Sequence, residues 1–141
     1  MGKIIFITNI DRRYAMMKKA LQELQEDCQM DAEAMSIKIS EGEKWSQDWE
    51  NLLSQADFFC IKWMGNGLDT PFFKKLLPFL QVTKASYYID AAGTEENEIV
   101  SGIEKPILYK IKMYSLYNGL VNFKNLWLYT KHIFSHREDI A

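Results

Sequence analysis

The residues best suited to contact a ligand follow three short apolar stretches of the chain. Lys3–Thr8, Asp57–Lys62 and Ser86–Ile89 each have the composition of a buried β-strand. In an open parallel sheet, ligands bind at the carboxyl ends of the strands, near the point where the strand order reverses. The sequence therefore predicts a ligand-binding crevice formed by residues that follow these strands: Asn9, Asp11, Trp63, Gly65, Asn66, Gly67, Asp90 and Thr94.

The segment at residues 63–67 has the composition most typical of a binding loop. Gly65 and Gly67 would let backbone amides approach a ligand, and Trp63 with Met64 would offer a flat apolar surface to a large ring. The alternative is that the glycines make a tight turn and Trp63 caps the core, which is the commoner role of a lone Gly-x-Gly pair. These residue types indicate a site but no reaction.

The motifs of nucleotide binding are missing from the sequence. It contains neither GxxxxGK[ST] nor GxGxxG, and Asp11 stands where a phosphate-binding loop requires glycines and hydroxyl groups. A response-regulator receiver would end its third strand with an aspartate, whereas this chain has Lys62. Asp11 and Asp90 are more readily turn formers or helix caps than a catalytic carboxylate pair. We therefore assign no catalytic residue.

Metal and thiol chemistry have little support. His132 and His136 have the spacing of a two-histidine metal pair, but no third ligand accompanies them and both lie near the end of a predicted helix, where histidine complements the dipole. Cys28 and Cys60 form no CxxC pair, and Cys60 lies in mid-strand, as a small core residue does. The sequence predicts neither a metal site nor a disulfide.

Composition points to a cytoplasmic globular protein. The formal net charge is -2, and the basic residues are scattered among acids, so no nucleic-acid footprint is indicated. The apolar run at residues 4–8 is too short for a signal-peptide core or a membrane span. We expect no membrane span and no nucleic-acid partner.

The pattern of elements predicts an α/β fold with three layers. A parallel four-stranded sheet of flavodoxin-like order 2-1-3-4 is expected, with its second, weaker strand at residues 33–39. The helix after the third strand should begin at Thr70-Pro71, because threonine caps free amides and proline suits the first turn. We treat residues 1–141 as a single domain, with a sheet core at 1–93 and a helical tail at 94–141.

The tail is predicted to contain helices only. A first helix is expected from Thr94 to Gly102, and Pro106 opens a second. The last helix is apolar on more than one side, because the consecutive residues from Trp127 to Tyr129 cannot all face the sheet. Part of the tail is therefore expected to contact a partner or further polypeptide.

Three segments carry a resemblance to a known family. They are residues 56–67 (ADFFCIKWMGNG), the segment Asp90-Ala91-Ala92-Gly93-Thr94, and the pattern Tyr114-x-x-Tyr117-Asn118-Gly119-x-x-Asn122-Phe123-x-Asn125-Leu126. Together they resemble the N-terminal region of the CobN and magnesium-chelatase H-subunit family, across most of the chain. The glycine pair of that family is Asn118-Gly119 here, and asparagine also tolerates positive φ.

The resemblance implies a role in ATP-dependent metal insertion. Members of the family are the large, tetrapyrrole-binding subunits that insert cobalt into a corrin precursor or magnesium into protoporphyrin, while ATP is bound by a partner subunit. It implies a CobN-like N-terminal domain that contributes to tetrapyrrole or subunit binding and is inactive alone. Its partners would be the remainder of a CobN-like polypeptide or the ATPase subunits, contacted through Tyr117, Gly119, Asn122, Trp127 and Tyr129.

Two other hypotheses remain open on the residues alone. The chain could be a stand-alone flavodoxin-like module that binds a small ligand or acts as a sensor. It could also be a purely structural docking domain. A well-formed pocket around Trp63 and Asn66 would favour binding, and its absence would exclude both binding hypotheses.

Overall fold

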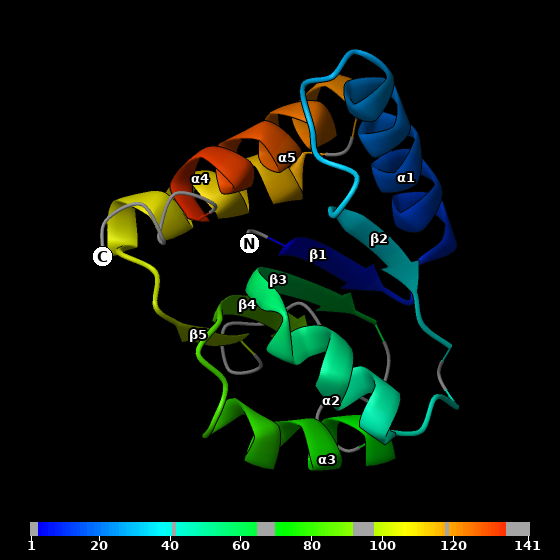
Figure 1. The fold of residues 1–141 in the computed structure, drawn as a ribbon, viewed down its shortest axis with the longest axis vertical. Helices are drawn as coiled ribbons and strands as arrows, with labels where there is room; N and C mark the ends of the chain where they lie inside the picture. The colour runs from blue at the N-terminus through cyan, green and yellow to red at the C-terminus, as the bar shows by residue number, and fades with distance from the viewer. Residues whose placement is uncertain (1–2, 41, 65–69, 92–97, 118, 135–141) are drawn as a thin grey trace.

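The computed structural model describes residues 3–40, 42–64, 70–91, 98–117 and 119–134. Its strands are β1 (Lys3–Thr8), β2 (Met35–Lys38), β3 (Ala56–Trp63), β4 (Ser86–Ala91) and β5 (Glu98–Ser101). Its helices are α1 (Asp11–Glu26), α2 (Gln47–Ser54), α3 (Pro71–Leu80), α4 (Lys105–Leu116) and α5 (Leu120–Phe134). The architecture is α/β, with helices on both faces of one sheet (Figure 1).

The sheet is mixed rather than wholly parallel. Its strand order is β2-β1-β3-β4-β5, with parallel pairing from β2 through β4 and antiparallel pairing between β4 and β5. The order of the first four strands agrees with the predicted one. The predicted four-stranded, all-parallel sheet with a purely helical extension is wrong, because β5 adds a fifth strand at one edge.

β5 lies where the sequence predicts a helix from Thr94 to Gly102. Its central residues, Ile99 and Val100, are β-branched and favour a strand. Ile99 packs with the α2 and α3 side of the core and Val100 with the α1 side, so alternate residues serve opposite layers. The strand forms by pairing with the edge of β4, a long-range contact that the helix-start pattern in the sequence does not take into account. Thr94 itself lies outside the described residues.

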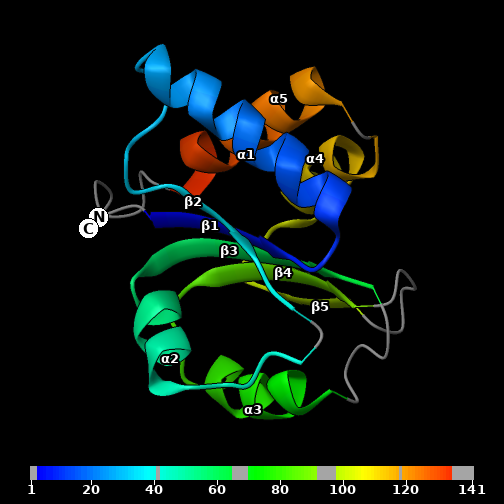
Figure 2. The same cartoon turned by 90° about the vertical axis from the view of Figure 1, so that its right-hand side faces the viewer.

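β1 and β3 are buried on both faces. Because successive side chains of a strand point to opposite sides, Ile5, Ile7 and Phe59 pack toward α2 and α3. Phe6 and Phe58 pack toward α1, α4 and α5. Figure 2 shows these two helical layers on opposite sides of the sheet.

The first turn of α3 forms as predicted. Thr70 is the N-cap residue, and its side-chain oxygen accepts a hydrogen bond from the backbone N–H of Phe73 at 3.4 Å. Pro71 occupies the first helical position, where its missing N–H costs nothing. This helix then buries Phe72, Phe73 and Leu76 against the sheet.

Trp127 attaches α5 to the sheet. Its side chain is 0% exposed, its ring meets the ring of Phe6 edge-on with centroids 4.5 Å apart, and its Nε1 donates to the carbonyl oxygen of Met17 at 3.0 Å. Phe134, the last residue of α5, stacks on Phe58. Trp127 therefore packs inside this chain and, against the expectation from the sequence, has no surface left for a partner.

Substitution of Trp127 should test whether α5 is part of the core. We expect Trp127→Ala to lower the free energy of unfolding by about 3–5 kcal/mol, because it leaves a cavity and removes the hydrogen bond to the carbonyl oxygen of Met17. Val121→Ala, on the same helix at a side chain that is 70% exposed, should change it by less than about 0.5 kcal/mol. Urea denaturation measures both, and equal effects would contradict this assignment.

The buried thiol of Cys60 predicts a loss of stability at alkaline pH. Burial raises the pKa of Cys60 from 9.0 to about 12, so the thiol ionises at lower pH in the unfolded chain than in the folded one. Its contribution is fully present below about pH 9 and is lost as pH rises through about 12. Urea denaturation across this window should show a fall of about 1.4 kcal/mol per pH unit from this group. The fall should be shallower in Cys60→Ala, and an unchanged slope would disprove the assignment.

Candidate functional site

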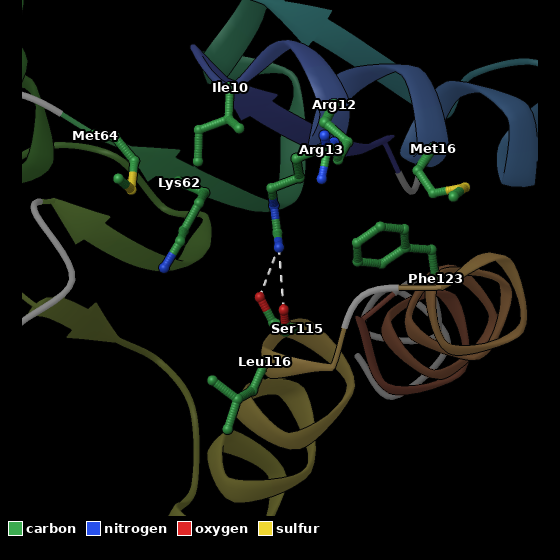
Figure 3. Close-up of a pocket in the computed structure, with 9 residues that line it drawn as sticks. All are labelled: Ile10, Arg12, Arg13, Met16, Lys62, Met64, Ser115, Leu116 and Phe123. Carbon is green, nitrogen blue, oxygen red and sulfur yellow. Dashed lines mark hydrogen bonds between the residues drawn. The ribbon is translucent and has the colours of Figure 1, made fainter.

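A cavity of about 350 Å³ opens at the carboxyl ends of β1 and β3. These strands flank the point where the strand order reverses, since β1 has β2 on one side and β3 on the other. The cavity thus lies at the edge where the sequence predicts a ligand crevice. Figure 3 shows the residues that line it: Ile10, Arg12, Arg13, Met16, Lys62, Met64, Ser115, Leu116 and Phe123.

Segments far apart in the chain converge on this cavity. β1 passes directly into α1 through Asn9 and Ile10, so the first turns of α1 present the two arginines and Met16. The end of β3 supplies Lys62 and Met64. The end of α4 and the first turn of α5, which together form the α4–α5 corner, close the opposite side.

Arg13 links α1 to the α4–α5 corner. Its Nη1 donates to the carbonyl oxygen of Ser115 at 3.0 Å and its Nη2 donates to the hydroxyl oxygen of Ser115 at 2.6 Å. The guanidinium carbon lies 5.2 Å from the centre of the Phe123 ring, within cation–π range. Figure 3 shows the side chain reaching from α1 to Ser115 beside this ring. An arginine thus joins three helices at the cavity.

The guanidinium of Arg13 is buried without a carboxylate partner. The residue is 7% exposed, and no carboxylate in the described part of the chain lies within salt-bridge distance of it. Burial lowers the pKa of Arg13, and the negative charge of Asp90, farther away, opposes this effect. The cavity therefore contains a cationic group whose charge is not neutralised by a contact.

A row of polar side chains crosses the sheet beside Arg13. The strand register aligns Thr8, Lys62, Asp90 and Glu98 on neighbouring strands. Lys62 forms an ion pair with Asp90, and Lys112 of α4 pairs with Glu98 at 2.8 Å. Because these charges neutralise one another, the excess positive charge at the cavity comes from Arg12, which is exposed, and Arg13.

Two of the predicted ligand residues have structural partners instead. Asn9 exchanges two hydrogen bonds with the backbone of Met64, donating to its carbonyl oxygen at 2.6 Å and accepting from its N–H at 2.9 Å. Asn9 therefore ties the ends of β1 and β3 together at the rim of the cavity. Asp11 is exposed and pairs with Lys38 of β2, away from the lining residues.

Trp63 does not offer its ring to a ligand. It is 1% exposed and packs against Phe72 and Phe73 on the α2 and α3 side of the sheet. The alternation of β3 places Lys62 on the cavity side and Trp63 on the other. Asp90 lies beside the cavity through its pair with Lys62. The remaining predicted residues, Gly65, Asn66, Gly67 and Thr94, lie outside the described residues.

The predicted interface residues fall in different environments. Tyr117 is 56% exposed, and its carbonyl oxygen accepts a hydrogen bond from Asn122 at 3.1 Å. Gly119 has φ +149°, a conformation that favours glycine, just before α5. Tyr129 is half-buried and meets Tyr114 edge-on. Apart from the buried Trp127, these residues stay predictions, because no partner chain is present.

Sequence reasoning missed the arginines and the α4–α5 corner. A signal for Arg13 exists, because it lies four residues before Met17 and so shares the buried stripe of α1. A charged residue on an apolar stripe indicates a buried polar contact. Ser115 and Phe123 carry no such signal, since Ser115 lies 102 residues from Arg13 along the chain.

The described lining residues contain no nucleophile paired with a base. The hydroxyl of Ser115 accepts a bond from Arg13 and has no histidine among the lining residues to activate it. The described residues contain no cluster of three or more histidine, cysteine, aspartate or glutamate side chains that could hold a metal. Within that part of the chain, no helix is long and apolar enough to cross a membrane.

Comparison of the chain with protein-family models, with curated proteins and with solved structures finds no match. The resemblance to the CobN family therefore stays a prediction, and the geometry of the cavity carries the functional argument.

Removal of the Ser115 hydroxyl should measure the strength of the link between helices. We expect Ser115→Ala to lower the free energy of unfolding by about 1.5–3 kcal/mol, as for hydrogen bonds to charged groups. Ser54→Ala, at an exposed position at the end of α2, should cost less than about 0.5 kcal/mol. Urea denaturation of both variants provides the comparison, and a neutral Ser115→Ala would show that the hydrogen bond to the hydroxyl adds nothing to stability.

Proposed function

We propose that this chain is a binding module for a small molecule with an apolar body, held in the cavity between α1, the end of β3 and the α4–α5 corner. One observation carries the proposal: a cavity of about 350 Å³ at the strand-order reversal combines apolar walls with basic groups. Its volume is within the range of about 300–1,000 Å³ typical of small-molecule sites. A cavity of this size and lining supports a binding role.

The apolar walls come from different elements. The β1–α1 connection contributes Ile10, α1 contributes Met16 and the end of β3 contributes Met64. The α4–α5 corner contributes Leu116 and Phe123. Methionines adapt their shape to a ligand more readily than branched side chains do. Met64 and Leu116 are 56% and 70% exposed, so a ligand that covered them would gain apolar burial.

Anilinonaphthalene sulfonate, a fluorescent molecule with an apolar body, provides a direct test. We expect saturable binding to the native chain with one site, followed by its fluorescence. Leu116→Trp should weaken it by at least about tenfold by filling the cavity. Val121→Trp is the matched control, because Val121 is also 70% exposed but does not line the cavity.

Equal binding by the two tryptophan variants would place the dye elsewhere and overturn this proposal. Absence of saturable binding to the native chain would do the same and would favour the structural docking role.

A second candidate is the tetrapyrrole role that the CobN resemblance implies. The feature that favours it is the arrangement of Arg12 and Arg13 beside apolar walls, which suits a ring whose edge bears carboxylates. The cavity is at the small end of the ligand-site range, so it would take an edge of the macrocycle. Under this proposal the chain binds, whereas insertion of cobalt or magnesium and use of ATP belong to other parts of a chelatase.

Titration of the chain with protoporphyrin and with a cobalt-free corrin precursor separates the two candidates. The visible absorption of the tetrapyrrole is the readout, so the added tryptophans of the two variants do not interfere. A saturable spectral shift that Leu116→Trp weakens and Val121→Trp retains would support the tetrapyrrole role. No shift with either ring, together with dye binding, would leave the small-molecule proposal and exclude the chelatase one.

A further inference from the structure

Arg13 has donor capacity that its contacts do not use. A guanidinium carries five N–H donors, and the described residues accept from one N–H of Nη1 and one of Nη2. Both bonds go to Ser115, at the end of the guanidinium. The remaining donors include Nε–H and an adjacent Nη N–H, which form a second, side-on fork.

Among the described lining residues, no carboxylate compensates the charge of Arg13. Asp90 is engaged by Lys62, and Glu98 by Lys112. The Phe123 ring lies 5.2 Å from the guanidinium and attracts it only weakly. Burial of a charge without an ion-pair partner is costly, so an anion that entered the cavity would recover part of that cost.

The geometry favours a planar anion with a single charge. The free side-on fork of a guanidinium matches the two oxygens of a carboxylate. A dianionic phosphate is less well matched, because Lys62, another basic lining residue, is already paired with Asp90. It would also find the N–H of Ile10 already bonded to the hydroxyl of Thr8 at 3.1 Å, and Asp11 in the first turn of α1.

We infer that the ligand of this cavity is a monocarboxylate with an apolar chain or ring, its carboxylate held by Arg13 and its body lying between Met16, Leu116 and Phe123. This inference rests on the proposed small-molecule function and adds the chemical class. Lys62 keeps its ion pair with Asp90. Arg12, which is exposed, attracts the anion at the mouth of the cavity. Arg13 is therefore the specificity residue.

A purely structural role for Arg13 makes a different prediction. If the side chain served only to hold Ser115 and Phe123, the cavity would not distinguish a carboxylate from an uncharged group of the same shape. A matched pair of molecules with one apolar body separates the two roles.

Naphthylacetate and naphthylacetamide form such a pair, with binding measured by isothermal titration calorimetry on the whole chain. We expect the acid to bind at least about tenfold more tightly than the amide. Arg13→Gln should bind the two alike. Lys19→Gln is the matched control, and its preference should stay within about threefold of the native one because this exposed side chain of α1 does not line the cavity.

The outcomes distinguish the inference from the function on which it rests. Equal affinities for acid and amide in the native chain would overturn the carboxylate assignment and leave the small-molecule site in place. Binding of neither molecule would overturn both. A preference that survives in Arg13→Gln would assign the anion to other groups and overturn the role of Arg13. Because the native comparison needs no variant, it decides the question even if Arg13→Gln does not fold.

Discussion

The burial of β1 and β3 on both faces is the constraint on which the rest of the structure depends. Phe6 and Phe58 project from one side of the sheet while Ile5 and Phe59 project from the other. Removing both sets from water requires a helical layer on each side. α2 and α3 form one layer, and α1 shares the other with α4 and α5. The C-terminal helices are therefore part of the core.

The cavity forms where the second helical layer ends. α1 begins at the carboxyl end of β1, and the α4–α5 corner lies opposite its first turns. Arg13 spans the gap, with its hydrocarbon stem buried and its polar head bonded to Ser115. An apolar side chain at this position would fill space but could not satisfy the polar atoms of Ser115. The same interaction that connects the helices thus leaves a basic group in the cavity.

Charge also contributes to the placement of the C-terminal helices. Residues 105–134 contain lysines but no aspartate or glutamate. Lys112 pairs with Glu98 of β5, and Lys124 pairs with Glu23 of α1 at 2.7 Å. Partly exposed ion pairs of this kind contribute about 0–1 kcal/mol each. They select the orientation of α4 and α5, while apolar burial around Trp127 supplies most of the stability.

Much of the fold was predictable because it depends on neighbours along the chain. Apolar runs locate β1, β3 and β4, and Thr70-Pro71 locates the start of α3. The position of the binding edge also follows, since the general rule for parallel sheets requires only the strand order. β5 was not predicted, because it forms a strand only by pairing with β4, and the propensities of neighbouring residues do not include that contact.

The sequence by itself determined the α/β class, the order of the parallel strands and the edge at which the cavity opens, because periodicity and helix caps are local properties. Only the tertiary structure decided which side chains meet there. In it, Trp63 packs on the α2 and α3 side of the sheet, and Asn9 bonds to the backbone of Met64. Arg13 bonds to Ser115, which lies 102 residues further along the chain. The physical reason is that a binding site is a set of long-range contacts, and these are chosen by the packing of whole layers.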